Sequence, residues 1–284
     1  MQDDIKNKLI VHEGATLPAL IEPQVPKRGL VARGLDEITG LVKPSVETAE
    51  SQCTLGKNYS EVLDRKQAAY WFKKAAEQGH LEAQYWLGWL HIREIDELFD
   101  VKLGLKYFKI SAEAGYVPSM VWLASRYMYG SPPLEEKHKD YKQAFYWFSK
   151  AAEQNDAVAQ RRLGYMYRKG KGLAKDNEQA VIWFRKSAEQ GDAIAQCDLG
   201  WMYASGTGVA QNDHLAISWY LKSANQGYVH AQGALGTLYE LGECVPSVDH
   251  KKAIKWYRKA AQQGDLQSKE ALEDLERRIK IYNL

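Results

Sequence analysis

The stretch Ala157–Asp192 reads AVAQRRLGYMYRKGKGLAKDNEQAVIWFRKSAEQGD, and it contains the unit from which most of this chain is built. At its centre is the pair Leu163-Gly164, and this pair or a close variant recurs along the sequence. The leucines of the six pairs are Leu55, Leu87, Leu123, Leu163, Leu199 and Leu235, separated by steps of 32, 36, 40, 36 and 36 residues. A period in this range is typical of solenoids, so we number the six units repeats 1 to 6.

The first half of the quoted stretch has the pattern of one amphipathic helix. Ala159, Leu163 and Met166 recur at intervals of three and four residues, which places them on one helix face. Gly170 and Gly172 follow, and glycine adopts the positive φ angles that a tight helix exit needs. We therefore expect the first helix of the repeat to end at Gly170.

A second helix is expected to begin after Asp176, whose carboxylate can accept the free N–H groups of a first helical turn. Its apolar stripe is Ala180, Trp183, Phe184, Ser187 and Ala188. Gly191 then ends the helix, and Asp192 can cap the next one. An Asp or Asn stands at the equivalent of position 176 in every repeat, namely at Asp64, Asp100, Asp140, Asp176, Asn212 and Asp249. The spacing predicts six antiparallel helix pairs, with the small residue of each Leu-Gly pair where the two helices approach.

One segment carries a close family resemblance. Residues 195–209 read AQCDLGWMYASGTGV, which resembles the Sel1-like repeat pattern Ala-x-x-x-Leu-Gly-x-x-Tyr-x-x-Gly-x-Gly-Val. That family is related to the tetratricopeptide repeat, but it has the longer period and the Gly-x-Gly loop seen here. The resemblance implies an all-α fold, a right-handed α-solenoid superhelix of six helix-turn-helix repeats with a C-terminal capping helix. It further implies that the first helix of each repeat lies on the inner side.

The repeats also define the expected domain organisation. Residues 46–265 form the solenoid, and residues 266–284 a C-terminal capping helix with its apolar stripe at Leu272, Leu275, Ile279 and Tyr282. Residues 1–45 hold four of the eight prolines and no repeat, so this segment is expected to be partly extended or disordered. Repeat 1 is four residues short, repeat 2 replaces the glycine loop, and repeat 3 has four extra residues near Pro132. These loop changes fit either a specialised surface or neutral drift in length.

Bulk composition narrows the environment. A net charge of +2 gives no reason to expect nucleic acid as a partner. The three cysteines (Cys53, Cys197 and Cys244) are an odd number in different repeats, which favours a reducing compartment over a disulfide framework. No secretory signal is visible and no apolar run is long enough to enter a membrane directly, so the cytoplasm is the expected location.

The glycine and histidine patterns of the sequence do not match known catalytic or metal-binding motifs. Gly170-x-Gly172 and Gly206-x-Gly208 lack the Lys-Ser/Thr of a phosphate loop, and their helix–helix turn accounts for them. His91 begins no His-Glu-x-x-His zinc motif. We therefore expect no enzyme activity, no metal and no cofactor.

The expected function is a non-catalytic scaffold or adaptor that binds a protein or peptide partner in its concave groove. Two alternatives remain open. One is an immunity protein that neutralises a cognate bacterial toxin, since the family resembles some of those, and the other is a regulatory subunit that tethers an enzyme or membrane complex. The sequence leaves the oligomeric state unknown.

The expected binding surface lies two residues before, two after and five after each Leu of the Leu-Gly pairs. Positions that vary between otherwise similar repeats are free to encode a partner, and aromatic and Arg residues dominate interface hot spots. The predicted row consists of Tyr85, Trp89, Ile92, Val121, Ser125, Met128, Arg161, Tyr165, Arg168, Cys197, Trp201 and Ala204. The alternative is that the tryptophans of this row only pack against neighbouring helices.

Overall fold

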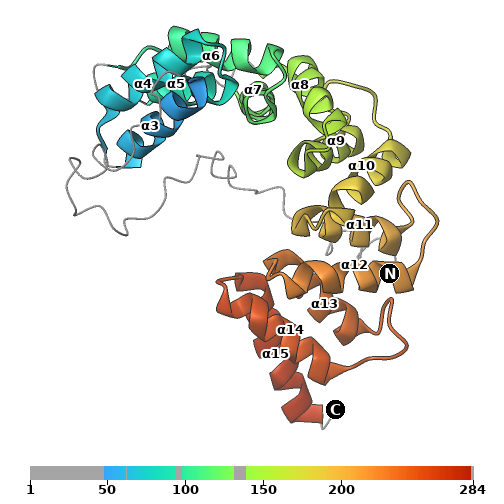
Figure 1. Ribbon diagram of the computed structural model, residues 1–284. Helices are drawn as coiled ribbons and strands as arrows, with labels where there is room; N and C mark the ends of the chain where they lie inside the picture. The colour runs from blue at the N-terminus through green and yellow to red at the C-terminus, as the bar shows by residue number, and fades with distance from the viewer. Residues whose placement is uncertain (1–47, 62, 94–97, 131–138, 283–284) are drawn as a thin grey trace. The chain divides into compact units, whose positions relative to one another are not determined.

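A computed structural model describes residues 48–61, 63–93, 98–130 and 139–282 of the chain, and all regular structure in these ranges is helical (Figure 1). The helices are α3 (Ala49–Glu61), α4 (Arg65–Glu77), α5 (Leu81–Ile92), α6 (Val101–Glu113), α7 (Val117–Tyr129), α8 (Tyr141–Glu153), α9 (Ala157–Lys169), α10 (Asn177–Glu189), α11 (Ala193–Ser205), α12 (Asp213–Asn225), α13 (Val229–Leu241), α14 (His250–Gln262) and α15 (Leu266–Tyr282).

The helices fall into two compact units. The N-terminal unit holds α3 to α7 and α8 up to Lys150, and the C-terminal unit runs from Ala151 to α15. In repeats 1, 2, 4, 5 and 6, the two helices of the repeat pack on each other, and within each unit the second helix packs on the first helix that follows it. This is the pairing that the sequence predicts, and it confirms the fold class, an all-α solenoid of six helix pairs followed by a final helix.

The predicted helix caps are present in all six repeats. At position 176, the Asp176 carboxylate accepts a hydrogen bond from the Gln179 N–H at 3.0 Å, so it satisfies one of the unpaired donors of the first turn of α10. The same contact, from cap oxygen to the third residue after it, is made by Asp64, Asp100, Asp140, Asn212 and Asp249. Asp192 likewise caps α11, as predicted, by accepting from the Ala195 N–H at 2.8 Å.

A backbone hydrogen bond closes the loop inside each repeat. The N–H of the cap residue donates to the carbonyl of the residue four positions after the Leu of the Leu-Gly pair, as Asp176 does to Tyr167 at 3.0 Å. We call this bond the loop clamp. The six clamps join Tyr59 to Asp64, His91 to Asp100, Tyr127 to Asp140, Tyr167 to Asp176, Tyr203 to Asn212 and Tyr239 to Asp249, with N···O distances of 2.8–3.0 Å.

The glycines of the Leu-Gly pairs lie under an aromatic ring of the second helix. A Cβ built on Gly164 would stand 2.8 Å from the ring of Phe184, which is fully buried. Gly88 and Phe108 make the same pair in repeat 2, where the distance is 2.6 Å. The sequence predicts that the helices approach closely at the glycine, but it does not identify this ring, which follows the Trp or Tyr of the second helix. Repeat 3, with Ala124, departs from the pattern.

Glutamine side chains link successive helices of the C-terminal unit. The Gln196 amide donates to the Ala188 carbonyl of the preceding repeat at 3.0 Å, and its oxygen accepts from Gln226 at 2.8 Å. Gln232 is placed in the same way between Ala224 and Gln263. These bonds satisfy buried amides and hold three consecutive helices in register, because each glutamine contacts the helix before and the helix after its own.

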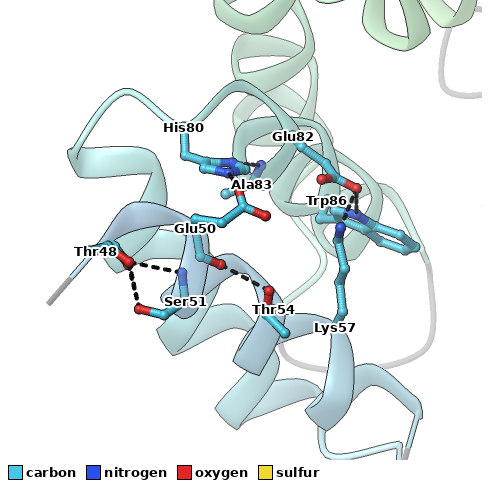
Figure 2. Close-up of polar contacts among 9 residues, drawn as sticks. All are labelled: Thr48, Glu50, Ser51, Thr54, Lys57, His80, Glu82, Ala83 and Trp86. Carbon is cyan, nitrogen blue, oxygen red and sulfur yellow. Dashed lines mark hydrogen bonds and ion pairs between the residues drawn. The ribbon is translucent and has the colours of Figure 1, made fainter. Parts of the chain in front are cut away.

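Polar contacts surround the start of the stack (Figure 2). His80 caps α5 by accepting the Ala83 N–H on Nδ1, and its Nε2 lies 2.9 Å from Glu50. The hydrogen bond from His80 lowers the pKa of the Glu50 carboxyl. Lys57 forms an ion pair with Glu82 at 2.6 Å, which extends the polar contacts between α3 and α5.

The outward face of α3 differs from the same face of later first helices. Ser51 and Asn58 stand at positions that hold buried Ala159 and Met166 in repeat 4, and they are themselves partly or fully exposed. Leu55 is only half-buried, whereas Leu163 is fully buried. A polar outer face of this kind is what the terminal repeat of a solenoid requires.

At the other end, α15 packs on α14 with one apolar stripe. Leu275 is fully buried against Tyr239 and Ile254, and Leu272 and Ile279 lie half-buried beside it. The Arg278 side chain forms an ion pair with Glu240 of α13, whose other carboxylate oxygen accepts from the Tyr257 hydroxyl at 2.8 Å. Four predictions lie wholly or partly outside the described residues: the extended or disordered segment 1–45, the altered loop at 94–97, the insertion at 131–136 and the side chain of residue 282.

Candidate partner-binding site

The predicted row reaches the surface mainly on the first helices of repeats 4 and 5. Along α9, Arg161, Tyr165 and Arg168 follow one another at helical spacing, so they share one face. Trp201 of α11 lies beside the guanidinium group of Arg168. We call the surface formed by Arg161, Tyr165, Arg168 and Trp201 the arginine–aromatic face. All four side chains are half-buried, so each is anchored by the fold and still has surface to offer.

Arg161 is oriented by the turn that precedes α11. Its Nε donates to Asp192 Oδ2 at 3.0 Å, while Asp192 Oδ1 caps α11. The aspartate thus fixes both the start of a helix and the direction of an arginine. Among the described residues, the two Nη groups of Arg161 have no hydrogen-bond acceptor.

Arg168 lies between two rings and a carboxylate. Its Cζ atom is 5.8 Å from the Phe184 ring centre and 5.4 Å from that of Trp201, which are cation–π distances. Its Nη2 is 3.5 Å from Asp198 Oδ1, an ion pair longer than an ordinary hydrogen bond. The Nε of Arg168 is buried and has no hydrogen-bond acceptor in the part of the chain that the structure describes.

Asp198 is the buried charge of this region. Loss of solvent raises the pKa of its carboxyl group, while the positive charges of Arg168 and Arg161 oppose that rise. The net direction is upward, so the arginines do not fully compensate for the burial of the carboxylate. The prediction of the row missed Asp198, which immediately precedes the Leu199-Gly200 pair. An acidic residue at a position held by Trp122 in repeat 3 was the available signal.

Aromatic surface completes the face. Trp201 packs against two buried hydrophobic clusters. One contains Phe184 and Leu199, and the other contains Tyr220 and Leu235. Tyr165 packs against the first of these groups. Each ring therefore combines a fixed position with an accessible edge, which is typical of interface anchors.

The remaining members of the predicted row are less accessible. Tyr85, Trp89, Val121, Met128 and Cys197 are buried, with at most 7% of their surface exposed. Ile92, Ser125 and Ala204 are half-buried. The row is therefore not a continuous exposed strip.

In the N-terminal unit, Tyr85 and Trp89 are buried because other aromatic rings pack around them. Trp122 of α7 stacks on Phe108 with ring centres 3.7 Å apart, and it meets Trp89 edge-on at 6.2 Å. Tyr85 also contacts Phe108 edge-on, with ring centres 5.6 Å apart. The rings of repeats 2 and 3 thus form one packed cluster, which is the alternative that the sequence left open for Trp89.

Metal ligands, membrane-spanning helices and thiols are the other features that bear on function in the described ranges. They contain no group of three or more His, Cys, Asp or Glu side chains placed to hold a metal ion. No helix in them has the length and apolar character needed to cross a membrane. The thiols of Cys53, Cys197 and Cys244 are unpaired, and burial raises the pKa of each one, to about 12 for Cys53 and Cys244.

Comparison with known proteins agrees with this fold. Six consecutive segments match the Sel1 repeat family, namely residues 50–80, 81–116, 117–156, 157–192, 193–228 and 229–265. A search of the curated proteins gives no match.

This chain is also similar to several proteins of known structure. A protective antigen present in uropathogenic Escherichia coli strains, displaying an SLR fold, is 30% identical over 84% of this chain and 51% of its own, with a TM-score of 0.75. This chain thus spans about half the length of that protein. A Sel1 repeat protein from Oxalobacter formigenes is 30% identical over 80% of this chain and 93% of its own, with a TM-score of 0.68. An immunity protein from Pseudomonas aeruginosa is 20% identical over 69% of this chain and 73% of its own, with a TM-score of 0.41. The six matched repeats and their structure place this chain in the Sel1 repeat family.

Proposed function

We propose that the chain is a non-catalytic adaptor that binds a protein partner through the arginine–aromatic face of repeats 4 and 5. The observation that carries the proposal is the combination of two half-buried aromatic rings and two half-buried arginines on neighbouring first helices. Such residues lose little conformational freedom on binding because the fold already orients them, and they supply most of the binding energy in many interfaces.

The buried members of the predicted row support this face indirectly. Cys197 lies in the core beneath α11, and the N-terminal members hold the aromatic cluster of repeats 2 and 3. We propose that Ala204 of α11 lies at the edge of this contact area, and that Ile92 and Ser125 are separate candidate contacts of the N-terminal unit. The cytoplasm remains our proposed location, which three unpaired cysteines support.

The test is affinity capture with the purified chain, followed by calorimetry with the captured protein and single variants. Trp201→Ala, Tyr165→Ala and Arg161→Ala should each weaken binding by at least about 1 kcal/mol, roughly five-fold in Kd, with helicity preserved. Arg258→Ala is the matched control, because Arg258 is an exposed arginine of α14. Unchanged affinity in all three variants would refute the proposed face.

Trp89→Ala is a poor probe of binding, because this side chain is buried and its loss would disturb the fold. The identity of the captured protein separates the open alternatives. A toxin whose activity is blocked would make the chain an immunity protein, and an enzyme or membrane complex would make it a regulatory subunit.

A further inference from the structure

We infer that the outward side of α4 and α6, in the N-terminal unit, binds the surface of a bilayer that contains anionic phospholipids. This surface is separate from the arginine–aromatic face, which belongs to the C-terminal unit, so the inference goes beyond the proposed function. We call it the lysine face and define it by six exposed side chains: Lys66, Lys73, Lys74, Lys102, Lys106 and Lys109.

The first step concerns the position of these lysines. On α4 the first and last of the three are eight residues apart, and on α6 they are seven apart, so each set spans two turns of one helix face. The opposite side of each helix holds a fully buried phenylalanine, Phe72 in α4 and Phe108 in α6. Both helices pack on α5, and Tyr107 of α6 packs against the core cluster that contains Phe72. The two sets of lysines therefore face solvent on neighbouring helices.

The second step concerns charge. Together, α4 and α6 contain seven basic and two acidic residues, whereas the whole chain has a net charge of only +2. The acidic groups lie at the helix ends, because Asp64 and Asp100 are the N-caps and Glu77 and Glu113 are the last helical residues. Five of the six lysines form no ion pair within the described ranges, namely Lys73, Lys74, Lys102, Lys106 and Lys109. Clusters of about four to eight basic residues are typical of surfaces that bind anionic lipids.

The third step concerns apolar groups at the same surface. Tyr70 of α4 and Ile110 of α6 stand next to the lysines and are 49% and 39% exposed. The Nζ atom of Lys74 lies 4.8 Å from the centre of the Tyr70 ring, so an ammonium group and an apolar ring share one site. Leu63 and Phe99, each immediately before the N-cap of one of these helices, are also exposed. Such a mixture suits the headgroup layer of a bilayer, where ammonium groups meet phosphates and apolar side chains enter.

Other anionic partners fit this surface less well. Nucleic-acid sites rely on arginine and on several stacking rings, whereas the lysine face has one exposed ring, Tyr70, beside an aliphatic Ile110. The basic helix α14 is the other candidate for a bilayer contact. Two of its five basic groups are paired, Lys252 with Asp249 and Arg258 with Glu276, and it has no exposed large apolar side chain.

The experiment measures binding of the full chain to lipid vesicles by co-sedimentation. One set of vesicles is phosphatidylcholine alone, and the other contains about 30% phosphatidylglycerol. We expect the chain to bind the anionic vesicles at least about ten-fold more strongly than the neutral ones in about 0.1 M salt, and to lose most of this binding in about 0.5 M salt.

Two triple variants with the same change in net charge locate the contact. Lys73→Glu combined with Lys106→Glu and Lys109→Glu should reduce binding to anionic vesicles at least about ten-fold. The matched control reverses Lys251, Lys255 and Lys259 of α14, which are also exposed and on a second helix, and it should keep binding within about two-fold of wild type. Circular dichroism melts check the fold, and glutamine replaces glutamate at the same positions if either variant does not fold.

Three results would overturn the inference: equal binding to neutral and anionic vesicles, no binding to either, or an equal loss in the two triple variants. If polyglutamate or an oligothymidylate of about twenty nucleotides binds through the lysine face while anionic vesicles do not, the face takes an acidic protein or a nucleic acid instead. Arg161→Ala should leave vesicle binding unchanged, so the two surfaces stand or fall separately.

Discussion

The junction between repeats 2 and 3 and the junction between repeats 4 and 5 use the same positions for opposite purposes. In each, a phenylalanine of the second helix is fully buried, Phe108 in one and Phe184 in the other. The residue just before the next Leu of a Leu-Gly pair then decides the outcome. It is Trp122 in the first junction and Asp198 in the second.

Trp122 stacks on Phe108 and closes the junction as an apolar core. Asp198 is too short to cover Phe184, so the guanidinium group of Arg168 lies over that ring instead and brings a charge near the surface. A few substitutions in a repeated framework, among them Trp122 to Asp198 and Ile92 to Arg168, thus distinguish core from candidate interface. Equivalent positions in a solenoid therefore need not share a role.

The largest expected loss of stability comes from a substitution at the junction between repeats 2 and 3. Trp122→Ala should destabilise the fold by about 3–5 kcal/mol, because it removes a buried indole from a stacked cluster. Trp201→Ala should cost less, about 1–2 kcal/mol, because that ring is only half-buried. Urea midpoints of the two variants measure the difference. Equal losses would show that the two junctions are not distinct.

The next largest expected loss of stability comes from overpacking at the junction between repeats 4 and 5. Gly164→Leu should cost about 1–3 kcal/mol or more, because its side chain would have to displace the ring of Phe184. The same shift should move Arg168, which lies on that ring, and so weaken partner binding. Ala124→Gly in repeat 3 is the control with no added volume. A wild-type midpoint for Gly164→Leu would contradict the glycine–ring contact.

The helix caps should not distinguish the junctions. Asp100→Ala and Asp176→Ala each remove one cap hydrogen bond of about 3.0 Å, so both should cost about 1 kcal/mol. Chemical denaturation of the two variants tests this equality. A large gap between them would mean that the difference between the regions extends beyond the interface positions.

The smallest effect is a dependence on pH at Asp198. Its pKa is raised in the folded chain, so folding takes up a proton between the unfolded and folded pKa values. Stability due to this group therefore falls as the pH rises through that range, and the penalty persists at neutral pH. Asp198→Asn removes it and should stabilise the fold by on the order of 1 kcal/mol or less at pH 7.

Below the usual pKa of an aspartate, the two proteins should converge, since Asp198 is then protonated in both states. Thermal melts from pH 3 to pH 8 check this course. A variant that matches wild type at low pH but is less stable at neutral pH would show instead that the ion pair with Arg168 stabilises the fold.

Sequence and structure agree best where the deciding contacts are local. The caps were predictable because Asp176 and the N–H that it accepts are three residues apart. The exits at Gly170 and Gly172 were predictable because both glycines adopt the positive φ angles that the turn requires. The pairing of the helices followed from their short loops.

The candidate site was harder to predict because its contacts join different repeats. Whether Trp89 is buried depends on Trp122, a residue of the next repeat, and the helical period cannot reveal that contact. Arg161, Tyr165 and Arg168 were placed on one face by periodicity alone, whereas the orientation of the two arginines depends on Asp192, at the end of repeat 4, and on Asp198 of repeat 5. The spacing of residues predicts which helix face they share, but the exposure of a side chain depends on the packing of neighbouring repeats.

Because of the loop clamp, the fold of a repeat depends little on the length of its loop. Tyr59 and Asp64 are five residues apart, Tyr127 and Asp140 are thirteen apart, and the closing bond is 3.0 and 2.9 Å long in the two cases. Closing the longer loop costs only about 0.8 kcal/mol more in chain entropy. Foreign peptides inserted between Gly130 and Lys139, after the end of α7, should therefore leave the helix pairs intact, which makes repeat 3 a natural point for carrying an epitope or a tag.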